Sequence, residues 1–244
     1  MTDLHTLHGR PGEKGGVIFW LFLGVAMFAA LNMAFMNINR VGQPGDMTEA
    51  DRLRATDIMQ YANAVQRGLR VMKIEGVNDT SICFHTDQWD HNDYEFSPAC
   101  DDPTNVVFDP RGGSISFSET VDDWFGNAST SASINDENLW VFSGRLEVEN
   151  VGTDGGAGTS QDDNTDLLMV TAPIKDNVCK AINEMLNYDP VIPSVSSGVH
   201  DSLANNKFAG DYTAGANKIG DFGRERCLHD DEGFNFYYKV ILAR

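Results

Sequence analysis

The longest apolar stretch of the chain lies near its beginning. No charged residue occurs between Lys14 and Arg40, and residues 17–31 are apolar throughout. A helix over residues 16–36 would be about 30 Å long, which matches the hydrocarbon core of a bilayer. A helix buried in a soluble domain is rarely apolar on every face for this length. The pattern therefore predicts a membrane-spanning or assembly helix over residues 16–39.

A second, amphipathic helix is predicted after a short break. Residues 40–47 contain two glycines and a proline, which interrupt helices and predict a hinge. From Thr48 onward, apolar residues recur at spacings of three and four, and Asp51 stands where a capping-box partner of Thr48 would stand. The pattern predicts a helix over residues 48–73 with one apolar stripe against a core.

The remaining chain has the shorter apolar runs and turn residues that are typical of strands. Pro173 is predicted to open a third helix over residues 174–187, and residues 188–225 show no regular pattern. The expected strands are 80–84, 105–108, 114–118, 138–150, 166–171 and 234–243, with the second and third forming a hairpin around the turn at 109–113. We therefore expect an α+β fold: a long N-terminal apolar helix, then an amphipathic helix packed on a mainly antiparallel sheet.

The charges that flank the apolar run predict its orientation. Arg10 and Lys14 precede the run and several acidic residues follow it, which favours a cytoplasmic N-terminus. The expected organisation is a cytoplasmic leader (1–15), a transmembrane or assembly helix (16–39), a hinge (40–47) and an exported domain (48–244). A cleaved secretory signal is the alternative interpretation of the same run.

The net charge restricts the classes of partner. The chain has 18 basic and 36 acidic residues, which give a net charge of −18. Binding to a phosphate backbone needs a basic face, so no nucleic-acid partner is expected.

The cysteines suit an oxidising compartment. Cys83, Cys100, Cys179 and Cys227 form no CxxC pair, and an even number of cysteines in an exported domain favours two disulfides. Three pairings are possible, of which we favour Cys83–Cys100 with Cys179–Cys227. Four buried free thiols are the alternative.

The N-terminal layout resembles that of type IV pilins and type II secretion pseudopilins. The resemblance lies in the run from Glu13 to Leu31, EKGGVIFWLFLGVAMFAAL, followed by the amphipathic helix. The chain is also similar to a group of alphaproteobacterial pilin-like membrane proteins, through FDPRGG at 108–113 and YYKVILAR at 237–244. Prepilins are cut after a glycine, so the resemblance implies leader cleavage between Gly16 and Val17. The glutamate found at the fifth mature position of pilins is replaced here by Leu21.

Small residues in the apolar run would let helices approach one another closely. A plain tether with incidental small residues is the alternative. The residues that we assign to the membrane or assembly helix are Val17, Phe19, Leu21, Gly24, Ala26, Ala30 and Ala34.

Few residues suggest metal or catalytic chemistry. The acidic loop from Asp154 to Asp166 could bind calcium through Asp154, Asp162, Asp163 and Asp166, although its acids are bunched and do not alternate as in an EF-hand. His85 opens a polar segment rich in histidine and acids, which could also be an ordinary solvated loop. The chain has no G-x-S-x-G elbow, P-loop or Rossmann fingerprint. We expect no enzyme activity and no cofactor apart from this possible calcium.

Two functional hypotheses follow. The first is a non-enzymatic structural subunit of a type IV pilus- or pseudopilus-like envelope filament, whose partners are the membrane and other copies or pilin-like subunits. Its expected location is the bacterial inner membrane as a single-pass protein, with the C-terminal domain periplasmic or extracellular. The second hypothesis is a monomeric membrane-tethered periplasmic binding module.

Overall fold

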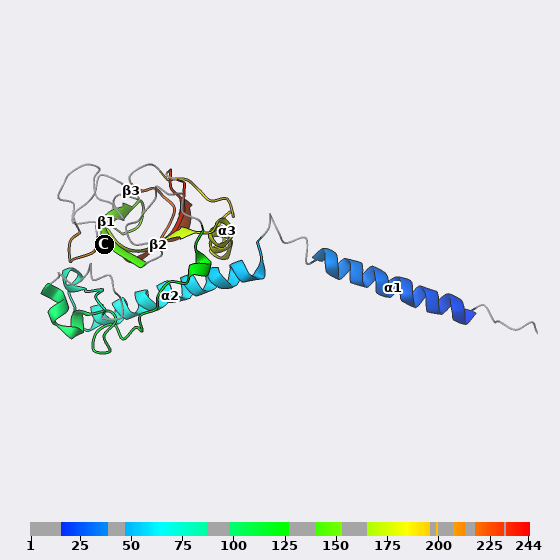
Figure 1. Cartoon of the computed structure of the whole chain (residues 1–244), viewed down its shortest axis with the longest axis horizontal. Coiled ribbons are helices and arrows are strands. Elements are labelled where there is room, and N and C mark those ends of the chain that lie inside the picture. The colour runs from blue at the N-terminus through cyan, green and yellow to red at the C-terminus, as the bar shows by residue number, and fades with distance from the viewer. Residues whose placement is uncertain are drawn as a thin grey trace, which may run out of the picture. The chain divides into compact units, whose positions relative to one another are not determined.

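The computed structural model divides the chain into two units, Met1–Gly45 and Asp46–Arg244 (Figure 1). The residues that it describes are 16–38, 47–86, 98–126, 140–152, 165–195, 199, 207–212, 218–231 and 233–244.

The first unit contains helix α1 (Gly16–Ile38). The side chains described in α1 are those of residues 19–29 and 31, and all of them are exposed. Among the residues that the structure describes, no helix combines the length and the hydropathy required to cross a bilayer. The predicted long apolar membrane helix is therefore not confirmed.

Helix α2 (Glu49–Ile74) begins and ends almost where the sequence pattern predicts. The Thr48 hydroxyl accepts a hydrogen bond from the Asp51 backbone N–H at 3.2 Å, and the Asp51 carboxylate accepts one from the Thr48 N–H at 2.9 Å. This reciprocal capping box satisfies two amides that the first helical turn leaves unpaired. The buried side chains of the α2 stripe include Ala55, Ile58, Ala62, Val65, Leu69 and Met72.

A five-stranded sheet with helix α3 (Asp176–Met185) completes the second unit. The strands are β1 (Trp140–Val148), β2 (Asp166–Ile174), β3 (Lys218–Ile219), β4 (Glu225–His229) and β5 (Asn235–Leu242). Their order in the sheet is β3-β1-β2-β5-β4. The α+β class is thus confirmed.

The sheet is mixed, so the prediction of a mainly antiparallel sheet is wrong. The β1–β2, β2–β5 and β4–β5 pairs are antiparallel, whereas β1 pairs with β3 in parallel. The physical reason is the path of the chain: after α3 it crosses to the far edge of the sheet, where β3 runs in the direction of β1.

Both faces of the sheet are buried. On one face, Phe142, Met169 and Tyr237 belong to a core cluster that also contains the apolar stripes of α2 and α3. On the other face, Val141 and Val170 belong to a second cluster, which includes residues from the segments between strands. Buried positions on both faces explain why the central strands are almost continuously apolar.

Some local predictions fail where long-range contacts decide. The expected hairpin at 105–118 is wrong: this segment forms the short 3₁₀ helix Pro103–Asn105, turns, and one isolated parallel bridge between Cys83 and Val106. Pro173 lies within β2 and does not open the helix, so α3 begins only at Asp176.

Candidate functional site

Part of helix α1 exposes apolar side chains around its whole circumference. The four consecutive side chains of Phe19, Trp20, Leu21 and Phe22 have exposed fractions of 63%, 68%, 64% and 69%. At about 3.6 residues per turn, four consecutive residues point in all directions around a helix. An unpartnered apolar surface of this kind is typical of a helix that lipid or other helices cover.

The predicted assembly residues divide into two groups. Phe19, Leu21, Gly24 and Ala26 are exposed in α1, and a Cβ added at Gly24 would meet no atom within 4 Å. Val17, Ala30 and Ala34 also lie within α1, but their side chains are outside the described residues. Gly16 is the first residue of α1, and the cleavage predicted after it stays a prediction.

Both predicted disulfides are present, and no cysteine is free. Cys179 in α3 is bonded to Cys227 in β4, and both residues are fully buried. Cys83 is bonded to Cys100 beside Phe84, whose ring stacks on that of Phe142 at 3.9 Å between centroids. The Cys179–Cys227 bridge therefore fixes α3 to the sheet, and the Cys83–Cys100 bridge fixes the 3₁₀ helix Pro98–Asp101 to the segment that carries Phe84.

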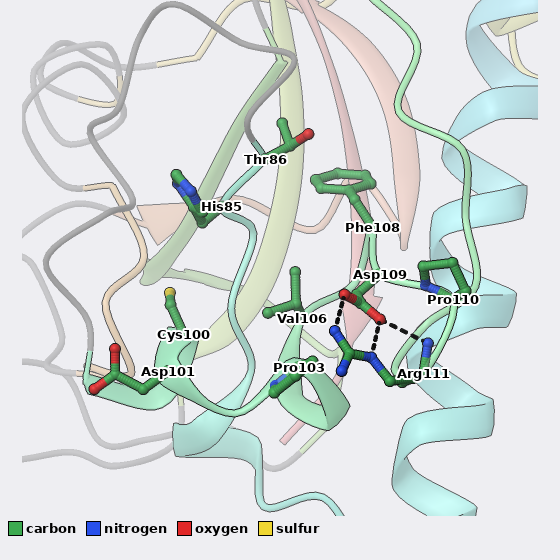
Figure 2. A pocket seen from close by; sticks show the side chains of 10 residues that line it. All are labelled: His85, Thr86, Cys100, Asp101, Pro103, Val106, Phe108, Asp109, Pro110 and Arg111. Atoms are coloured by element: carbon green, nitrogen blue, oxygen red, sulfur yellow. Dashed lines mark hydrogen bonds and ion pairs between the residues drawn. The ribbon is translucent and has the colours of Figure 1, made fainter.

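A surface cleft of about 360 Å³ lies next to the Cys83–Cys100 bridge. Figure 2 shows His85 and Asp101 on one side and the paired side chains of Asp109 and Arg111 on the other. Its lining residues are His85, Thr86, Cys100, Asp101, Pro103, Val106, Phe108, Asp109, Pro110 and Arg111.

The charged pair in this cleft is largely self-satisfied. The Arg111 guanidinium donates to both carboxylate oxygens of Asp109 at 3.0 Å, and the Arg111 backbone N–H donates to the same carboxylate at 2.8 Å. These hydrogen bonds hold the pKa of Asp109 below its usual value and raise the pKa of Arg111. The two charges of the pair therefore compensate each other within the cleft.

The acidic loop is only partly placed. Asp154, Asp162 and Asp163 lie outside the described residues, so the predicted calcium site stays a prediction. Asp166 begins β2 and is fully buried. Its two carboxylate oxygens accept hydrogen bonds from the backbone N–H groups of Val148 at 3.1 Å and Arg244 at 3.2 Å. In the described part of the chain, no three His, Cys, Asp or Glu side chains are grouped to hold a metal.

A buried polar cluster beneath α2 was missed in the sequence. Lys239 of β5 lies next to Glu225 of β4 and Asn63 of α2, and the Tyr237 hydroxyl contacts the same glutamate. The signal that could have found it is a single lysine in the otherwise apolar and aromatic run from residue 236 to 243. A lysine in such a strand is seldom fully buried unless it is paired.

No protein-family model, no curated protein and no solved structure matches the chain.

Proposed function

We propose that this chain is a non-enzymatic structural subunit of a type IV pilus- or pseudopilus-like envelope filament. The observation that supports the proposal most is the apolar circumference of α1, where Phe19, Trp20, Leu21 and Phe22 are all exposed. In a filament, copies of this helix would cover one another, and before assembly the bilayer would cover it.

The second unit suits the exported part of such a subunit. Helix α2 carries a complete capping box and packs its apolar stripe against the sheet, so it provides a rigid spine. The two disulfides favour the oxidising side of a membrane. We therefore propose a single-pass protein of the bacterial inner membrane, with a cytoplasmic N-terminus and a periplasmic or extracellular domain.

A membrane-tethered periplasmic binding module is the second candidate, and the cleft beside Cys83–Cys100 favours it. In that case α1 would be only an anchor. The two proposals differ in what they require of Gly24, because close helix packing needs a small residue there and a lipid anchor does not.

A Gly24→Leu variant separates the two. No described atom lies near an added Cβ at this position, so the change leaves the chain's own packing intact. If the chain is a filament subunit, electron microscopy of sheared cells should show filaments for the wild type and none for Gly24→Leu, with both proteins still in the membrane fraction. Wild-type protein that stays monomeric in detergent, without filaments in cells, would reject the subunit proposal and leave the tether.

A Leu21→Arg variant serves as the matched control for the apolar surface. A charge at this exposed position of α1 should remove the protein from the membrane fraction under either proposal. N-terminal sequencing of wild-type protein then tests processing, since a start at Val17 requires cleavage after Gly16.

A further inference from the structure

Lys239 occupies a core position of strand β5. Side chains two residues apart along a strand point to the same face of a sheet. Tyr237 lies two residues before Lys239 and Ile241 two residues after it. Both belong to the core cluster beneath α2. Lys239 has an exposed fraction of only 5%, so its ammonium group lies where the pattern of the strand calls for an apolar side chain.

Two groups contact the amine, and a third contacts one of those two. Lys239 Nζ forms an ion pair with Glu225, its cross-strand partner in β4. Nζ also donates a hydrogen bond to Asn63 Oδ1 of α2 at 2.9 Å. The Tyr237 hydroxyl donates to Glu225 Oε1 at 2.7 Å, and burial raises the pKa of Tyr237, which keeps the phenol protonated as a donor.

The two charges of this pair lie next to each other and are largely removed from water. Removing an ammonium and a carboxylate from water is costly, and a buried pair is often no more stable than apolar side chains of the same size. Transfer of one proton from Nζ to Glu225 produces two neutral groups, whose burial costs less. A neutral, desolvated lysine amine is a nucleophile.

An electrophilic carbon lies next to that amine. Asn63 Oδ1, which accepts the hydrogen bond from Nζ, is joined to Asn63 Cγ by a carbonyl bond of about 1.2 Å. Nζ therefore lies no more than about 4.1 Å from Asn63 Cγ.

We propose that Lys239 and Asn63 form an intramolecular amide bond, with Glu225 as the catalytic acid and base. This proposal does not rest on the proposed function. It assigns to the cluster a self-modification that joins α2 to the last strand of the sheet, across a sequence separation of 176 residues.

The reaction balances without an external reagent. Glu225 takes a proton from the Lys239 ammonium, and the freed lone pair of Nζ forms a bond to Asn63 Cγ while the carbonyl electrons move to Oδ1. Glu225 then delivers its proton to Nδ2 and accepts the second proton of Nζ. The carbonyl re-forms, the Cγ–Nδ2 bond breaks with its electron pair on nitrogen, and ammonia leaves. Ammonia takes up the proton that remains on Glu225, so the net products are the amide and one ammonium ion.

Peptide mass spectrometry of the full chain tests this directly. Trypsin cleaves after Arg54, Arg67 and Arg226. Reduced protein should therefore yield peptide 55–67 joined to peptide 227–244. The mass of this product should be lower, by one ammonia, than the summed masses of the two free peptides. Cleavage after Lys239 should be blocked, because trypsin requires a free lysine side chain. Recovery of unlinked 55–67 and of a peptide ending at Lys239 from wild-type protein overturns the proposal, whatever the variants do.

Two variants test the roles within the cluster. Lys239→Arg keeps the positive charge but should abolish the linked peptide completely. Glu225→Gln keeps hydrogen-bonding capacity but cannot exchange protons, and it should also leave the peptides unlinked while near-ultraviolet circular dichroism stays like that of the wild type. A linked peptide in folded Glu225→Gln protein would overturn the role of Glu225.

The matched control is Gln66→Ala. Gln66 also joins α2 to β5, because its side-chain amide donates to the Val240 carbonyl at 2.9 Å, and this hydrogen bond goes to the backbone of β5 instead of to the lysine side chain. This variant should retain the linked peptide in full. Loss of the link in Gln66→Ala that remains folded would show that general α2–β5 contact, and not the Lys239 cluster, controls the yield.

Discussion

Asp166 holds three parts of the chain together through one carboxylate. It begins β2, and its two oxygens accept backbone hydrogen bonds from Val148 at the end of β1 and from Arg244 at the C-terminus. Burial is the largest influence on this group and, with the nearby Glu147 carboxylate, raises the pKa of Asp166 to about 6, although both backbone hydrogen bonds oppose the shift.

This raised pKa predicts a pH dependence of stability. The folded state binds the Asp166 proton more tightly than the unfolded chain does, for which the pKa is 3.8. The contribution of this group to the free energy of unfolding is therefore fully present below about pH 4 and is lost as the pH rises through about 6. In urea unfolding, the wild type should be less stable at pH 7 than at pH 4 by about 2 kcal/mol on account of this group, and Asp166→Asn should lack that difference.

The control for Asp166→Asn is the pH dependence of the wild-type free energy of unfolding. Other acidic groups contribute equally in both proteins, so only the difference between wild type and variant is diagnostic. Identical slopes in the two proteins would contradict the assignment.

At the scale of elements, local signals at the ends of α2 are as informative as its apolar stripe. The capping box of Thr48 and Asp51 marks the start, and Gly76, with a φ of 96°, lies just beyond the end. Glycine adopts this left-handed conformation without strain, so the helix stops where the sequence places it.

We expect Thr48→Ala to lower the free energy of unfolding by about 1 kcal/mol, because it leaves the Asp51 N–H without its cap. Thr56→Ala is the matched control on the same helix. Its hydroxyl donates to the Arg52 carbonyl, which is within the helix, so its loss exposes no unpaired amide. Chemical unfolding of both variants measures the difference, and equal losses would argue against the capping contribution.

The two disulfides should contribute unequally. Cys179–Cys227 closes a sequence separation of 48 residues and Cys83–Cys100 one of 17. In the chain-entropy description, these loops correspond to about 4 and about 3 kcal/mol of stabilisation. The double variant Cys179→Ala/Cys227→Ala should therefore unfold at lower denaturant than Cys83→Ala/Cys100→Ala. The reverse order would show that packing around each bridge outweighs loop length.

At the scale of the whole molecule, the second unit contains both core clusters and both disulfides. No residue of these clusters or bridges comes from the first unit. The exposed apolar side chains are concentrated in the first unit, on α1.

A chain that begins at residue 46 should consequently fold with both disulfides formed. Its denaturant midpoint should match that of the full chain, since no core side chain is removed. Under the proposed filament function, the same truncation should abolish membrane fractionation and filaments. Fractionation of cells that produce each form measures this, and a truncated form still found with membranes would place the membrane contact in the second unit.

Much of the fold was predictable because its signals are local. The apolar spacing and capping box of α2, and the apolar runs of β1 and β5, lie within short segments of sequence. The favoured cysteine pairing was also confirmed. For the candidate site, the apolar residues of α1 could be named from the sequence alone, since hydropathy needs no partner to be recognised, and their role in membrane contact or assembly stays a prediction.

Tertiary structure alone decided what depends on distant partners. β4 and the two-residue β3 have weak patterns of their own and form because β5 and β1 offer them free edges. The mixed sheet follows from the crossing after α3, which no local signal encodes. The cluster of Lys239, Glu225 and Asn63 brings together side chains from three elements. The carboxylate of Asp166 is held by backbone groups of β1 and of the C-terminal residue. Burial and long-range contact, which exist only in the folded chain, give these side chains their chemistry.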